Sequence, residues 1–289
     1  MNNQKTYVAY VAFFIAAMVF FIYYLFPSTT IADYMSNAAS LQHPDLEVFV
    51  DHVSPAFPPG LKFDGLKIDY RQQPALTAQR ARFSPVLRTL FSTSRKVNFD
   101  IVCADGSING QADIIKEKDG VLIKSKAELS DIEIGKINAV NVYSPHLLSG
   151  ILNGQVSVNT DLTSDVQNEA ELTISDFKIT LETPIINVES FEFKSIVASL
   201  SLSQRRIRLR KCTLKGRDMD GEITGTLSIR VPFENSLLNF SGTIQPHPEF
   251  MAQLSSTLPV AMLSAQSIGQ KGLPFRIRGT VNNPGFSLR

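Results

Sequence analysis

The 289-residue sequence contains no tryptophan, only two cysteines and only four histidines. Cys103 and Cys212 allow one disulfide but no disulfide framework, and they lack the paired spacing of a zinc site. Two isolated thiols are favoured over a bond between them. The histidines are scattered without the short spacings that place two ligands on one metal. We therefore expect no metal site.

The short motifs of the common enzyme classes are also missing. No G-x-S-x-G, G-x-x-x-x-G-K-[ST] or G-x-G-x-x-G ahead of a helix is present, so the usual hydrolase, P-loop and dinucleotide signatures are absent. We expect a protein that is not an enzyme, with no catalytic residues and no cofactor.

Charge gives no hint of a polyanionic partner. The chain has 28 basic and 27 acidic residues and a formal net charge of +1, so no field of one sign surrounds the molecule. Its densest basic segment has no interleaved aromatic residues on which bases could stack. Nucleic acid is not expected as a partner.

What the sequence does contain is one long uncharged segment, residues 7–26, reading YVAYVAFFIAAMVFFIYYLF. As a helix it would be about 30 Å long, which matches the hydrocarbon thickness of a bilayer. Tyrosines flank it at both ends, where aromatic rings favour the headgroup region. The sequence predicts a membrane anchor whose principal side chains are Tyr7, Tyr10, Phe13, Phe14, Ile15, Phe20, Phe21, Tyr23 and Tyr24.

A cleaved signal peptide is the alternative, but its apolar core would be shorter, roughly 7–15 residues. Lys5 precedes the segment, whereas residues 27–46 contain no lysine or arginine. This asymmetry favours a cytoplasmic amino terminus. We expect a cytoplasmic segment (1–6), a transmembrane helix (7–26), a juxtamembrane amphipathic helix (27–45) and a periplasmic β-rich domain (46–289) in the bacterial inner membrane.

Nearly everything after the anchor alternates between apolar and polar residues with the period of a β-strand. Strands are expected at 46–50, 61–70, 77–83, 97–103, 107–116, 120–129, 154–162, 170–181, 185–193, 197–203, 206–214, 222–231, 238–245 and 275–281. Helices are expected at 28–41, after Ser84-Pro85, after Ser144-Pro145 and at 248–268. With no long helix between successive strands, the fold class is mainly β: a curved antiparallel sheet with a few short helices.

Three strand segments share a G-x-[IL]-x-G pattern that begins at Gly106, Gly150 and Gly221. By alternation, their glycines lie on the same face as their aliphatic residues. This face contains Ile108, Gly110, Ile114, Leu152, Gly154, Val156, Ile223, Gly225 and Leu227. Two interpretations remain open: a curved sheet packed on its own helices, or a trough whose apolar floor holds a lipid chain or a partner's apolar segment.

A row of arginines forms the second candidate surface. Arg206, Arg208 and Arg210 alternate with Ile207 and Leu209 and should share one face of a strand. They could contact phospholipid headgroups or an acidic partner. The alternative is a solvated outer face, or an edge strand that its charges protect from aggregation.

The order of several segments resembles a known family. They read ALTAQRARFSPVLRTLFS (75–92), DGSINGQADI (105–114), SDIEIGKINAV and LLSGILNGQVSVNTDL within 130–162, AELTISDFKI (170–179), CTLKGRDMDGEITGTLSIRVPF (212–233), TIQPHPEF (243–250) and LPFRIRGTVNNPGFSLR (273–289). Together they are similar to the type II secretion system protein N family (GspN) and, more distantly, to the periplasmic AsmA/TamB group.

The resemblance implies an inner-membrane protein with its bulk in the periplasm, which acts as a non-catalytic accessory of type II secretion and contacts other secretion components. The wider AsmA-like group implies, as an alternative, a curved β-groove that binds or transfers phospholipid. Neither family supplies catalytic residues.

Overall fold

The computed structural model describes residues 2–42, 45–57, 59–116, 120–160, 168–185, 188–203, 205–255 and 272–288. Their strands form one antiparallel sheet of fourteen strands, in which every strand pairs with its neighbours in sequence. The mainly β, antiparallel fold class is therefore confirmed. Most connections are too short for a parallel crossover, and the longer β6–β7 and β12–β13 connections also join antiparallel neighbours.

The strands are β1 (Leu46–Ala56), β2 (Gly60–Tyr70), β3 (Gln73–Pro85), β4 (Ser94–Cys103), β5 (Gly106–Lys116), β6 (Val121–Glu133), β7 (Leu147–Asn159), β8 (Asn168–Ile185), β9 (Val188–Ser203), β10 (Arg206–Gly216), β11 (Met219–Ser228), β12 (Leu237–Pro246), β13 (Leu273–Thr280) and β14 (Pro284–Leu288). The helices are α1 (Asn2–Tyr24), α2 (Ser28–Gln42), α3 (Asn138–Tyr143) and α4 (Pro248–Ser255), with short 3₁₀ turns η1 (Leu87–Thr89), η2 (Ile134–Lys136) and η3 (Phe233–Asn235).

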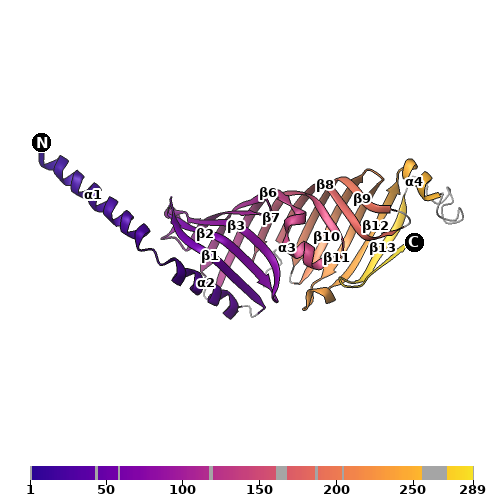
Figure 1. Ribbon diagram of the computed structural model, residues 1–289, viewed down its shortest axis with the longest axis horizontal. Helices are drawn as coiled ribbons and strands as arrows, with labels where there is room; N and C mark the ends of the chain where they lie inside the picture. The colour runs from indigo at the N-terminus through magenta and orange to yellow at the C-terminus, as the bar shows by residue number, and fades with distance from the viewer. Residues whose placement is uncertain are drawn as a thin grey trace.

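Helix α1 extends away from the first strands, whereas α2 lies against them (Figure 1). The expected membrane segment, 7–26, begins within α1 and runs into its connection with α2. Among the residues that the structure describes, no helix meets the length and hydrophobicity required of a membrane span.

Two clusters of buried residues lie over β1–β7. Ala32 of α2 packs with Val53, Phe63 and Ala81 of the first three strands. A second cluster joins Ala78, Cys103, Ala104 and Ile132, and the partly buried Ile137 before α3 packs against it. Period-two alternation therefore supplies one apolar face, and two short helical segments cover its first half.

Several predicted boundaries are wrong. The expected strands 185–193 and 197–203 form one strand, β9, which runs without a break through Lys194, Ser195 and Ile196. The strand β14 was missed, since Asn283, Pro284 and Gly285 suggested an irregular tail rather than a hairpin.

Two of the predicted helix starts are also wrong. Ser84 and Pro85 end β3, and the 3₁₀ turn that follows has no side-chain cap. Ser144 forms a turn with His146 and leads into β7, while the helix of this region, α3, precedes it. The helix predicted over 248–268 is confirmed as α4 up to Ser255; residues 256–268 lie outside the described part of the chain.

Candidate functional site: an apolar face across the sheet

Strand register aligns apolar residues in a row that crosses every strand of the sheet. We call it the long row. Each member is the direct cross-strand partner of the next: Pro55, Leu61, Phe83, Phe99, Gly110, Ala127, Val156, Ala170, Leu200, Leu209, Gly225, Phe240, Ile277 and Phe286. Directly opposed residues lie on the same face of a sheet, so these positions form one continuous apolar stripe.

A parallel row runs beside it from β1 to β13. Its members are Val53, Phe63, Ala81, Ile101, Ile108, Leu129, Gly154, Leu172, Ala198, Cys212, Ile223, Gly242 and Phe275. Bulges in several strands shift the register by one residue, as between Leu209 and Cys212 in β10. These shifts keep both rows apolar where strict alternation would have turned a polar residue inward.

The nine residues predicted for this face are placed on it. Ile108, Gly154 and Ile223 belong to the second row, and Gly110, Val156 and Gly225 belong to the long row. The other three lie in flanking rows, where Leu152 pairs with Ile174, Leu227 with Leu238 and Ile114 with Ile123. The sequence prediction did not foresee that register joins the three glycine strands into one surface.

The glycines on this face make room for phenylalanine rings from the adjacent strand. A Cβ on Gly110 would clash with the ring of Phe99, and one on Gly242 would lie 2.8 Å from the ring of Phe275. A ring can therefore approach the backbone this closely only where the opposing residue has no side chain. Part of the close approach that the glycine pattern indicated is thus made by the sheet's own rings.

The opposite face is polar. A row on that side runs through Ser54, Lys62, Arg82, Asp100, Asn109, Glu128, Gln155, Glu171, Ser199 and Lys211. The sheet is therefore amphipathic along its length, with one wet face and one apolar face.

The arginines predicted as a ribbon are all exposed. Arg206 and Arg208 lie opposite Ser203 and Ser201 on the polar side. Arg210 lies at the bulge of β10, so it leaves the strict alternation, and its Nη2 is 2.6 Å from Oε1 of Glu169 on β8. Glu169 is aligned with Arg208 through Ser201, so Arg210 reaches the polar side that carries the other two arginines. Contact of these arginines with phospholipid headgroups or an acidic partner stays a prediction.

Helix α3 reaches from the β6–β7 connection to a connection much later in the chain. The rings of Tyr143 and Phe233 meet edge to face with centroids 5.3 Å apart. Burial raises the pKa of Tyr143, and Glu234 beside it and Tyr70 in the β2–β3 hairpin raise it further, while Arg71 opposes them. Three distant connections therefore meet at Tyr143. Sequence analysis missed this contact, because one short helix and one aromatic residue carry no periodic signal.

The two cysteines are free and buried, which confirms the expectation of isolated thiols. Cys103 is the last residue of β4 and belongs to the second core cluster, and Cys212 lies in the second row on β10. Burial raises the pKa of both thiols. Both side chains thus behave as small apolar residues of the face.

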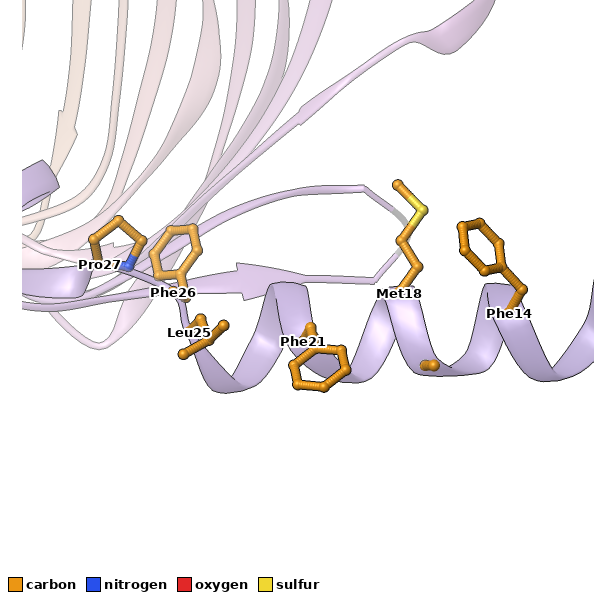
Figure 2. A pocket seen from close by; sticks show the side chains of 7 residues that line it. Phe14, Met18, Phe21, Leu25, Phe26 and Pro27 are labelled. Carbon is orange, nitrogen blue, oxygen red and sulfur yellow. The ribbon is translucent and has the colours of Figure 1, made fainter.

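The predicted anchor residues lie on α1, and all nine are exposed in the structure. An apolar cavity of about 640 Å³ lies along this helix and its connection to α2. Figure 2 shows Phe14, Met18, Phe21 and Leu25 along the helix, with Phe26 and Pro27 at its end. Exposed apolar surface of this extent marks a candidate contact with a partner protein or a membrane.

Within the described ranges, no group of three or more histidine, cysteine or acidic side chains is arranged to hold a metal. In the comparisons with known proteins, no family model, no curated protein and no solved structure matches the chain.

Proposed function

We propose that the chain is a membrane-anchored, non-catalytic protein that binds the acyl chains of lipids on its apolar β-face. The observation that carries this proposal is the long row, which remains apolar through all fourteen strands. With about 4.8 Å between neighbouring strands, the row extends roughly 60 Å. A stripe of this length is far more than a small domain needs for its own core, and several acyl chains arranged along it are the simplest ligands that would cover it.

A curved sheet would make this face a trough, and the Tyr143–Phe233 contact supports curvature. The β6–β7 and β11–β12 connections lie at opposite ends of the strands, and five strand spacings separate them. In a flat sheet, the spacing alone would separate them by about 24 Å. Their rings are instead 5.3 Å apart, as expected if strong twist and curvature bring the two edges together over the apolar face.

Membrane anchoring by α1 is part of the same proposal. The helix has 23 residues, so it is about 34 Å long, and its apolar side chains make few contacts with the rest of the protein. Lys5 on the amino-terminal side favours a cytoplasmic start and a periplasmic sheet in the bacterial inner membrane. A topology reporter fused after Arg289 should be active only in the periplasm; activity in the cytoplasm would contradict this orientation.

Crosslinking in living cells tests lipid binding at neighbouring positions on opposite faces. A photoreactive residue at Ile223, in the second row, should form phospholipid adducts, whereas the same group at Thr224, opposite Ser241 on the polar side, should not. Equal lipid adducts at both positions would indicate non-specific contact with the membrane. If Ile223 formed adducts only with the protein's own helices, the apolar face would be part of the protein core, which would contradict lipid binding.

The accessory role in type II secretion is the second candidate. The segments that resemble that family include most of β5 and all of β7, β11, β13 and β14, so the resemblance extends along one continuous sheet. Adducts of Ile223 with a secretion subunit, together with loss of secreted protein on deletion of the gene, would support this role. Lipid adducts with unchanged secretion would favour lipid binding alone.

A further inference from the structure

A basic pocket lies on the polar face of β2–β4, beside the end of α1. Its volume is about 750 Å³, and Lys62, Arg80 and Arg82 line it together with Asp100. Tyr23 of α1 and Phe57 of the β1–β2 turn lie at the same pocket. The pocket therefore combines three cations with the end of the proposed membrane helix.

The cations of this pocket are incompletely neutralised. Lys62 and Arg82 are direct cross-strand partners, an arrangement of like charges that destabilises a sheet unless an anion compensates it. Lys62 and Arg80 share one carboxylate, Asp64, at 2.8 Å and 3.9 Å. Asp100 is the cross-strand partner of Arg82 and the acidic residue of the lining.

Arg82 itself has spare hydrogen-bonding capacity. Its Nη2 donates to the carbonyl oxygen of Phe57 at 2.5 Å. Its Nε is buried and has no hydrogen-bond partner among the described residues. A buried guanidinium nitrogen without an acceptor costs free energy, and a phosphate oxygen is an acceptor that guanidinium groups bind well.

The neighbouring tips of the sheet are apolar. In an antiparallel meander the β1–β2 turn and the β3–β4 connection lie at the same end of the strands. Phe57 in the first is 83% exposed, and Phe91 in the second is 101% exposed, with Leu87 close by in sequence at 54%. Exposed aromatic and aliphatic tips beside basic groups are the composition of segments that enter a membrane interface.

We propose that this pocket binds the phosphate of an anionic phospholipid from the bilayer that α1 occupies, with Phe57 and Phe91 inserted among the lipids around it. The inference rests on the proposed anchoring of α1. It adds a headgroup site on the polar side of the sheet, distinct from the apolar face, and it fixes the β1 end of the sheet against the membrane surface.

Spin labels on the full chain in vesicles test this placement. Labels are attached to the single substitutions Phe57→Cys, Phe91→Cys, Gln72→Cys and Phe14→Cys; native Cys103 and Cys212 are buried. Gln72 lies in the β2–β3 turn, at the other end of the strands, and serves as the aqueous control. Labels at positions 57 and 91 should be accessible to oxygen and protected from a water-soluble relaxation agent, as at position 14, while position 72 should remain accessible to that agent.

The outcomes separate the two proposals. A lipid-protected label at position 14 with water-exposed labels at positions 57 and 91 would overturn the headgroup inference and leave anchoring intact. A water-exposed label at position 14 would instead contradict the anchoring on which the inference rests.

The headgroup preference is tested with charge-neutral variants. Adding phosphatidylglycerol to phosphatidylcholine vesicles should increase the protection of the label at position 57 from the water-soluble relaxation agent. The double variant Lys62→Gln, Arg82→Gln should lose this increase. Lys67→Gln, on β2 but outside the pocket, should keep it. An increase that survives in the double variant would overturn the site. An increase abolished by soluble glycerol phosphate would show that the pocket prefers free phosphate to lipid, which would also overturn the lipid assignment.

Discussion

The two halves of the sheet have the same apolar face but differ in what covers it. Over β1–β7, α2 and the segment before α3 bury two clusters around Phe63 and Cys103. Over β8–β14 the rows continue, yet most of their side chains are only half-buried, and the described residues form no comparable cluster there. The first half therefore contains both buried clusters. The second half, where Ile196, Cys212, Phe250 and Phe275 are buried without forming such a cluster, offers more of the surface that a ligand could cover.

The largest expected effect compares one phenylalanine from each half. Phe63 is 2% exposed and packs against Phe83, so Phe63→Ala should lower the free energy of unfolding by about 3–5 kcal/mol. Phe240 is half-buried in the long row on β12, so Phe240→Ala should lower the free energy of unfolding by only about 1–2 kcal/mol. Urea denaturation followed by circular dichroism measures both.

Lipid should change the second value and not the first. If acyl chains cover the C-terminal half, added phospholipid should stabilise the wild type, and Phe240→Ala should reduce that gain. Equal losses for the two variants without lipid would show that both halves are equally well packed, and the comparison would fail.

Alternation alone was enough to predict most strands, the antiparallel class and which residues share a face. Ile108, Leu152 and Ile223 could be assigned to one side because each strand fixes its own parity. The register between strands could not be predicted, because it depends on bulges such as the one between Leu209 and Cys212, where a one-residue offset carries no turn signal in the sequence.

The sequence also predicted only part of the helical structure that covers the apolar face. Helix α2 was predicted at 28–41. Ile31 and Met35 are four residues apart and so lie on one side of it, and both pack on the first core cluster. Helix α3 has six residues, too few for a periodic pattern, so its contact through Tyr143 depends on tertiary structure alone.

The next expected effect concerns the rings that lie on glycines. A Cβ at Gly242 would meet the carbonyl oxygen of Glu222 and the ring of Phe275, so Gly242→Ala should destabilise the C-terminal half by about 1–3 kcal/mol. Combining it with Phe275→Leu should recover part of this loss, which a double-mutant cycle measures. Gly120→Ala is the control, since a Cβ there would meet nothing within 4 Å. No recovery would mean that the backbone contact dominates.

A smaller effect is expected where the two halves touch. Removing the ring in Tyr143→Ala should cost about 0.5–1.5 kcal/mol and should speed hydrogen exchange around Phe233 more than in the core near Phe63. Tyr143→Phe keeps the ring pair and should leave exchange unchanged. Faster exchange in both places would mean that α3 supports the whole sheet rather than joining its two edges.

The smallest effect is a pH dependence from one buried thiol in each half. Burial raises the pKa of Cys103 and Cys212, so the folded protein holds these protons more tightly than the unfolded chain, whose thiols titrate near pH ~8.5. Their contribution is complete below that pH and is lost as pH rises through the folded-state pKa. Unfolding measured from about pH 8 to about pH 10 should therefore show a loss of stability that the variant Cys103→Ala, Cys212→Ala reduces.

In the wild type, iodoacetamide should modify Cys212 before Cys103, because only Cys103 lies in the covered core. The reverse order would place the more open half at the membrane end of the sheet.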